Sequence, residues 1–167
     1  MPSYKEAHAG RFRGCGRWWC LGIGLNKIES SDVKKRVLIA VDWFPPAFKA
    51  GGPIRSAYNL AAFLSQTHEV WVVTGNRDLD EEQTLDVRTD QWCTVETSTA
   101  TIQVRYTSGI DKGQWQDILD EVKPEVVHLN SLFSRGFTLL PLRVLRQRPN
   151  VRVVMAPRGM LGEAALS

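Results

Sequence analysis

From residue 36 onward, two hydrophobic patterns alternate along the chain. Short runs of β-forming apolar residues predict buried strands of a parallel sheet at residues 37–41, 68–74, 99–106, 125–130 and 151–156. Apolar residues spaced three and four apart predict amphipathic helices near residues 54–64, 115–122 and 137–148. Strands alternating with helices predict an α/β fold, a Rossmann-like parallel sheet with helices on both faces.

Two further segments lack sustained periodicity. Residues 1–33 are rich in Gly and Arg, and we interpret them as a poorly ordered basic extension outside the fold. Residues 34–167 then form one Rossmann-like domain, expected to be incomplete because the chain stops just after the fifth strand. Residues 75–90 are polar and acidic, which predicts a long loop.

Composition adds limits on function. The net charge of +3 is concentrated in the first 36 residues, so the expected domain has no basic stripe, which argues against a nucleic-acid partner. Three cysteines without a secretory signal favour reduced thiols and a cytoplasmic location. Cys15 and Cys20, near His8, match no zinc-binding spacing, so no metal site is expected.

No apolar run approaches the roughly 18–20 residues that cross a membrane. Residues 18–25 are apolar with basic neighbours, but they are short and contain Gly22 and Gly24. A poorly ordered tail is the favoured interpretation, and peripheral contact with the inner face of the membrane remains an alternative.

The strand ends are where chemistry is expected, because open parallel sheets bind ligands beyond their carboxyl ends. The relevant loops are residues 43–52, 75–78, 130–136 and 157–162. In the first, Gly51 and Gly52 precede Pro53 at a helix start, where free N–H groups favour an anion. Arg55 follows in the first turn, where the helix dipole disfavours a cation unless it faces an anion. The alternative is a surface arginine paired with Asp42 or with an acid of the loop.

The later strand ends offer two more polar groups. Asn130 ends the fourth strand and is a better ligand candidate than His128, which is more often a core histidine. Arg158 follows the fifth strand, where the alternative is a solvated turn arginine. The substrate- or phosphate-binding candidates are therefore Gly51, Gly52, Arg55, Asn130 and Arg158. No G-x-G-x-x-G follows a strand, which weakens a dinucleotide interpretation.

The order of these motifs resembles that of a known family. RVLIAVDWFPPAFKAGGPIRSAYNLAAFL, residues 36–64, is similar to the opening of bacterial family-4-type GT-B glycosyltransferases. HEVWVVTGNRDLD, EVVHLNSLFS and APRGMLGEAALS resemble the family's second strand, fourth-strand motif and Pro-Arg-Gly loop. The resemblance covers about residues 34–167, and it is specific in the order and spacing of the motifs rather than in any one of them.

The resemblance implies a retaining transfer of a sugar from a nucleotide donor to a sugar or lipid-linked acceptor, without a metal or other cofactor. Such enzymes commonly build polysaccharide, lipopolysaccharide or glycolipid at the cytosolic membrane face. The Gly51–Gly52 loop would lie against the donor diphosphate, and Arg55, Asn130 and Arg158 would line the cleft between two domains. Many relatives have histidine in place of Asn130, which puts a direct catalytic role of this position in doubt.

The resemblance also implies a missing half. The family binds its donor mainly through a C-terminal domain with two glutamates separated by seven residues, and this sequence has neither. We therefore expect an acceptor-side domain that is inactive alone and whose partner is a C-terminal donor domain or a separate chain of a split transferase. The third alternative is a non-catalytic module that binds a phosphorylated ligand. An exposed apolar face at the strand ends would favour the transferases, and a closed polar one the module.

Overall fold

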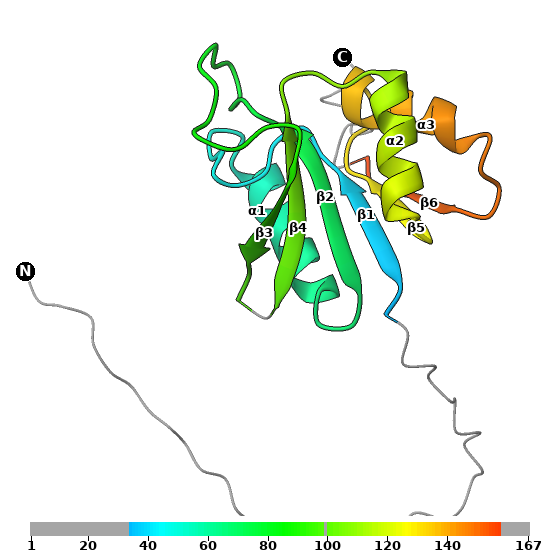
Figure 1. Cartoon of the computed structure of the whole chain (residues 1–167). Helices are drawn as coiled ribbons and strands as arrows, with labels where there is room; N and C mark the ends of the chain where they lie inside the picture. Colours follow the sequence, from blue (N-terminus) through cyan, green and yellow to red (C-terminus); the bar gives the residue numbers. More distant parts are fainter. Residues whose placement is uncertain (1–33, 99, 158–167) are drawn as a thin grey trace, which may run out of the picture. The chain divides into compact units, whose positions relative to one another are not determined.

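The computed structural model describes residues 34–98 and 100–157 (Figure 1). The expected extension at residues 1–33 lies outside them, as do residues 158–167 and with them Arg158. The strands are β1 (Arg36–Ala40), β2 (Glu69–Gly75), β3 (Trp92–Glu96), β4 (Thr101–Thr107), β5 (Val126–Leu129) and β6 (Arg152–Met155). The helices are α1 (Gly52–Leu64), α2 (Lys112–Val122), the π-helix η1 (Arg135–Leu139) and α3 (Leu140–Leu145).

The six strands form one sheet in the order β3-β4-β2-β1-β5-β6. β1 pairs in parallel with β2 and β5, and β4 and β6 continue the parallel pairing on either side. From β1 the chain continues to β2 on one side of the sheet. It later returns to the other side of β1, where β5 and then β6 are added. The strand order therefore reverses between β1 and β5, which is where such sheets form a ligand crevice. This architecture confirms the α/β class and is consistent with a small Rossmann-like fold.

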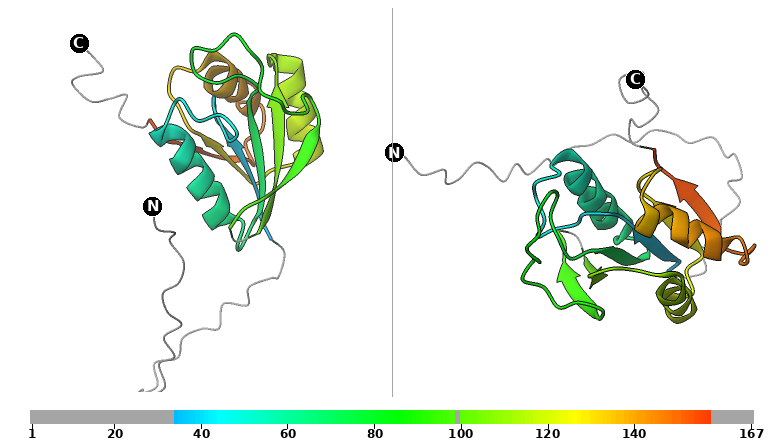
Figure 2. Two further views of the ribbon diagram at one scale, coloured as in Figure 1. Left: turned by 90° about the vertical axis from the view of Figure 1, so that its left-hand side faces the viewer. Right: turned by 90° about the horizontal axis from the view of Figure 1, so that it is seen from above.

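Helices cover both faces of the sheet, as predicted (Figure 2). Val37 and Ile39 enter one core, which α1 covers with Ala57 and Ala61. The intervening strand positions enter a second core with α2 and α3, where the largest fully buried side chain is Trp115. Alternate side chains of β1 thus serve opposite faces, because successive Cβ atoms of a strand point to opposite sides. This explains why a central strand is apolar at every position.

The predicted elements lie close to the observed ones, with one omission. β3 was not predicted, and residues 92–96 instead form the edge strand, antiparallel to β4. Its sequence, WCTVE, gives only a weak alternation because the strand is half-exposed at an edge. Packing fixes it: the Trp92 ring meets Trp71 edge-on with centroids 4.8 Å apart, and the Arg105 guanidinium lies 5.9 Å from the Trp92 ring centroid.

The opposite edge of the sheet is less covered. Every residue of β6 is exposed, and Val153, Val154 and Met155 retain 38%, 41% and 37% of their surface. In the described part of the chain, no helix has the length and hydropathy that a membrane-spanning segment requires.

Candidate functional site

The loop after β1, residues 41–51, forms the centre of the carboxyl edge of the sheet. Its interior is apolar: Phe44 is fully buried and Ala47 nearly so, and both belong to the α1 side of the molecule. The Phe44 and Tyr58 rings lie 6.2 Å apart. The hydroxyl of Tyr106 on β4, which belongs to the same core cluster as Phe44, donates a hydrogen bond to the carbonyl oxygen of Pro45. The loop is thus anchored to both α1 and the sheet.

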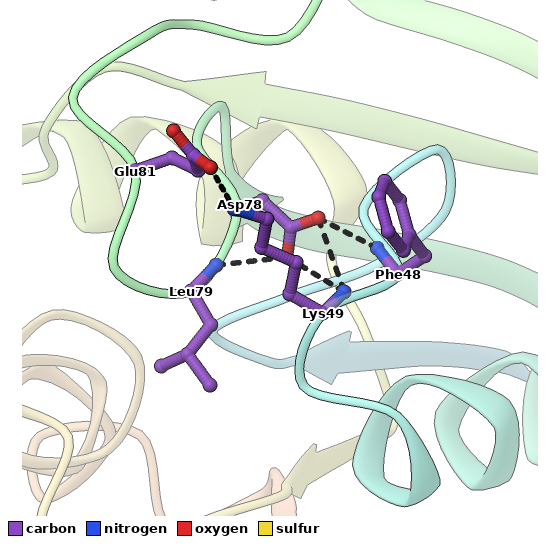
Figure 3. A network of polar contacts seen from close by, with 5 residues as sticks. All are labelled: Phe48, Lys49, Asp78, Leu79 and Glu81. Carbon is purple, nitrogen blue, oxygen red and sulfur yellow. Dashed lines mark hydrogen bonds and ion pairs between the residues drawn. The ribbon is translucent and has the colours of Figure 1, made fainter.

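Asp78, in the loop after β2, clamps this segment from outside (Figure 3). Its carboxylate accepts hydrogen bonds from the backbone N–H groups of Phe48 at 2.8 Å and Lys49 at 3.1 Å. It also accepts one from its neighbour Leu79 at 2.8 Å. Lys49 adds an ion pair to Glu81. These contacts join residues 78–81 to the loop that leads into α1.

The electrostatics of Asp78 fit this role. Desolvation raises the pKa of its carboxyl, but the three backbone donors and the charge of Lys49 outweigh it, so the pKa lies below its ordinary value of 3.8. The side chain therefore stays ionised at neutral pH. An ionised carboxylate accepts stronger hydrogen bonds than a neutral group, which makes Asp78 an effective backbone clamp.

The start of α1 leaves donors available. Gly51 is the N-cap, no side chain caps the helix, and its first turn contains no acidic residue. The N–H of Gly51 donates to Phe48, and Pro53 has no N–H. Within the described residues, the N–H groups of Gly52 and Ile54 have no hydrogen-bond acceptor. Two backbone donors of the first turn therefore have no partner in the described part of the chain, and such donors at a helix N-terminus favour an anion.

Glycine is present at positions 51 and 52 for different reasons. Gly51 has φ 63° and ψ −109°, a conformation that strains any residue with a Cβ. Gly52 has an ordinary φ, and a Cβ added there would meet no atom within 4 Å. The fold therefore requires glycine at position 51 but not at position 52. Close approach of a ligand is a reason for glycine at position 52 that the fold itself does not supply.

Gly51, Gly52 and Arg55 lie together in the lining of one open groove of about 560 Å³. We call this the α1 groove; its other lining residues are Pro45, Ala47, Phe48, Ile54, Tyr58 and Asn59. Arg55 is exposed, and its guanidinium forms no hydrogen bond or ion pair with any described residue. The alternative in which Arg55 pairs with Asp42 or with a loop acid is therefore not what the described part of the chain adopts.

Of the other two candidates, the structure describes only Asn130. Asn130 lies at the tip of β5, is 7% exposed, and donates its backbone N–H to Ala40 at 3.1 Å. It is not among the residues that line the α1 groove. Arg158 lies outside the described residues. His128 is half-buried on β5 next to β1, in register with Ile39.

The sequence analysis missed a polar pair at the point where strand order reverses. Asp42, two residues after the end of β1, accepts a hydrogen bond of 2.6 Å from the hydroxyl of Ser134, in the loop after β5. Burial raises the pKa of the Asp42 carboxyl, against the opposing effects of Ser134 and of its own backbone N–H. A carboxylate at a strand end is visible in the sequence, but its pairing across 92 residues is not.

Asp42 lines a second cavity, of about 270 Å³, which we call the Asp42 pocket. Its other walls are Trp43, Gly75, Asn76, Arg77, Thr107, Ser108, Gly109, Ile110, Gly136 and Phe137. The two cavities share no lining residue and lie on either side of the loop after β1. The carboxyl edge thus offers two separate sites rather than one.

Among the described residues, no group of three or more His, Cys, Asp or Glu side chains could hold a metal ion. Cys15, Cys20 and His8 lie outside that part of the chain. Comparison of the chain with protein-family models, with curated proteins and with solved structures gave no significant match.

Proposed function

We propose that this chain is the acceptor-side domain of a retaining GT-B-type glycosyltransferase. In this proposal the enzyme moves a sugar from a nucleotide-sugar donor to a glycan or lipid-linked acceptor, and a second domain or a partner chain binds most of the donor. The site works at the cytoplasmic face of the membrane, needs no metal or other cofactor, and is inactive without the donor half.

The observation that carries the proposal is the α1 groove. Its volume of about 560 Å³ is ample for a diphosphate and part of a sugar. Arg55, which pairs with no described residue, and the free N–H groups of Gly52 and Ile54 lie at the same helix start. Breaking a sugar–diphosphate bond places negative charge on the leaving group, and fixed donors and cations are the groups that stabilise such charge. The α1 groove supplies part of that set.

Exposed apolar residues give independent support. Phe48 follows β1, Phe133 follows β5 and Met155 ends β6, and they retain 73%, 69% and 37% of their surface. All three lie at the carboxyl ends of strands. Large exposed apolar side chains at one edge favour a surface that another domain covers over a closed binding module. The proposal therefore assigns this edge to the cleft between two domains.

The test is to join residues 34–167 to the donor domain of a family-4-type glycosyltransferase and to measure transfer from a panel of nucleotide sugars. We expect transfer by the fusion and none above background by the 167-residue chain alone. In an active fusion, Arg55→Ala should lower transfer efficiency about ten- to a hundredfold without changing stability, because a charge-assisted contact to phosphate is lost.

The matched control is Arg88→Ala, which removes an exposed arginine that lines neither cavity. Titration of the chain with pyrophosphate, followed by amide NMR shifts, gives a readout that does not depend on the fusion. We expect shifts at Gly52 and Ile54 that Arg55→Ala weakens and Arg88→Ala does not. Pyrophosphate binding that is absent, or unchanged by Arg55→Ala, would remove the basis of the proposal.

A further inference from the structure

The Asp42 pocket differs from the α1 groove in the chemistry of its walls. It holds one acid, Asp42, and one cation, Arg77, whereas the α1 groove holds the cation Arg55 and no acid. Arg77 is exposed and forms no ion pair with Asp42 or with any other described acid. The two charges of the Asp42 pocket are therefore available to a ligand, and together they favour one without net charge.

Asp42 is held so that its carboxylate has a fixed direction. Its carbonyl oxygen accepts the N–H of Gly75 at 3.2 Å and the hydroxyl of Thr74 at 3.3 Å. A Cβ at position 75 would lie 3.0 Å from that carbonyl oxygen, a tight contact that glycine at this end of β2 avoids. Ser134 donates to the carboxylate while its own oxygen accepts the N–H of Phe137 at 3.1 Å. Asp42 is thus positioned by the end of β2 on one side and by the loop after β5 on the other.

The carboxylate still has acceptor capacity. Apart from its own backbone N–H, Ser134 is the one group that donates to it among the described residues. A carboxylate has about four lone-pair sites, so it can accept further hydrogen bonds from ligand hydroxyl groups. Burial penalises its charge, and hydroxyl donors would offset that penalty. A second anion in the same pocket would increase the penalty on the charge of Asp42.

The remaining walls suit a small ring. Trp43, Ile110 and Phe137 are half-buried and apolar, and Ser108 is polar. The volume of about 270 Å³ lies below the roughly 300–1,000 Å³ of pockets for drug-sized ligands, so it limits the occupant to about one sugar ring. A lining that combines polar groups with apolar side chains suits a pyranose, which has both hydroxyl groups and a C–H face.

We propose that the Asp42 pocket binds an uncharged sugar ring, with Asp42 accepting hydrogen bonds from its hydroxyl groups. This inference rests on the proposed function, in which the ring is the acceptor sugar. Asp42 would then fix the acceptor beside the α1 groove, on the opposite side of the loop after β1. The structure thereby assigns a neutral ligand to one cavity and an anionic ligand to the other.

The test uses the full chain and four probes: the methyl glycosides of glucose, galactose, mannose and N-acetylglucosamine. Amide NMR shifts locate the binding. We expect at least one glycoside to shift the amides of Gly75, Asn76 and Gly109 with millimolar affinity, and to leave Gly52 and Ile54 unshifted. Absence of any shift in the Asp42 pocket with all four probes would overturn the inference.

Variants separate recognition from folding. Asp42→Asn keeps an acceptor for Ser134 but removes the charge, and it should weaken glycoside binding about tenfold. Arg77→Ala changes an exposed side chain of the same pocket and should weaken binding as well, whereas Arg55→Ala should leave it unchanged. Equal affinity in wild type, Asp42→Asn and Arg77→Ala would overturn the inference, as would inorganic phosphate that binds in this pocket.

The pyrophosphate titration described above distinguishes the two proposals. If pyrophosphate shifts Gly52 and Ile54 but no glycoside reaches the Asp42 pocket, the sugar assignment is wrong and the α1 groove keeps its role. If neither probe binds, both proposals are wrong. Glycoside binding that depends on Asp42 supports the sugar assignment whatever the result with pyrophosphate.

Discussion

The α1 groove and the Asp42 pocket are built on opposite sides of one loop, and their chemistries differ. The α1 groove presents backbone N–H groups and the guanidinium of Arg55, while the Asp42 pocket presents a carboxylate beside apolar rings. The difference arises because the C-terminal end of the loop, with Gly51, lines one cavity, whereas the side chain of Asp42 lines the other. A single segment can thus separate an anion site from a neutral site, provided that it is rigid.

The two cavities also differ in what holds them in place. The α1 groove depends on Asp78 and Glu81, which contact Phe48 and Lys49 of the loop. The Asp42 pocket depends on Ser134 and on the close approach of Gly75. Phe44, a fully buried residue of the loop itself, anchors the segment that separates the two cavities. Substitutions should therefore disrupt both cavities together or one at a time.

The largest effect is expected from Phe44→Ala, which removes the shared anchor. Phe44 is fully buried, and truncating such a residue typically costs about 3–5 kcal/mol in the free energy of unfolding. Urea unfolding measures the loss, and both the pyrophosphate and glycoside shifts should weaken. Phe48→Ala is the matched control: it removes a ring that is 73% exposed and should change stability by about 0.5 kcal/mol or less. Similar losses for the two variants would contradict the anchor role of Phe44.

Asp78→Ala should loosen the α1 groove alone. Loss of a carboxylate that accepts three backbone hydrogen bonds should cost about 1–3 kcal/mol. The pKa of Asp78 is lowered in the folded state, so its contribution is present above the ordinary value of 3.8 and is lost as pH falls through the folded-state pKa.

The stability gap between wild type and Asp78→Ala should therefore close in acid. Asp86→Ala, which removes an exposed acid of the same loop that has no described partner, should show no such gap at any pH. A gap that persists unchanged far below pH 3.8 would mean that the charge of Asp78 is not what holds the loop.

The two glycines of the α1 groove should respond in opposite ways. Gly51→Ala places a Cβ at φ 63° and should destabilise the chain by about 1–3 kcal/mol. Gly52→Ala meets no neighbour within 4 Å and should be neutral, or stabilise by about 0.4–1 kcal/mol through the unfolded chain. Gly52→Ala should nevertheless weaken pyrophosphate binding. Thermal melts and titrations of both variants test this, and full pyrophosphate affinity in Gly52→Ala would show that ligand approach does not require glycine there.

The smallest effect is expected from Asp42→Asn, which should increase the stability of the chain. Burial raises the pKa of Asp42, so the ionised carboxylate destabilises the folded state once pH rises above the ordinary value of 3.8 and through the raised one. Asn carries no charge, so the melting temperature should rise by a few degrees at neutral pH and match wild type below pH 3.8. A variant that is more stable but binds glycosides less tightly would indicate a binding role. A loss of stability at neutral pH would show that the charge supports the fold instead.

Hydrophobic patterning was sufficient to predict most of the fold. The strand at residues 37–41 was predicted because it is a continuous apolar run, and the helix that contains Trp115 because its apolar residues follow the helical period. β3 was not predicted because an exposed edge strand needs only a few apolar contacts, and these are made with Trp71 and Arg105 far away in the sequence. The grouping of Gly51, Gly52 and Arg55 was predictable because they are neighbours on one helix start.

The sequence by itself determined the α/β class, the position of the α1 helix start and the residues at each strand end. Only the tertiary structure decided which of those residues meet. It leaves Arg55 unpaired among the described residues, uses Asp78 as a clamp, and joins Asp42 to Ser134 across 92 residues. The physical reason is that periodicity and helix capping are local, whereas the pairing of polar groups at a sheet edge depends on strand order, which the chain sets only when it folds.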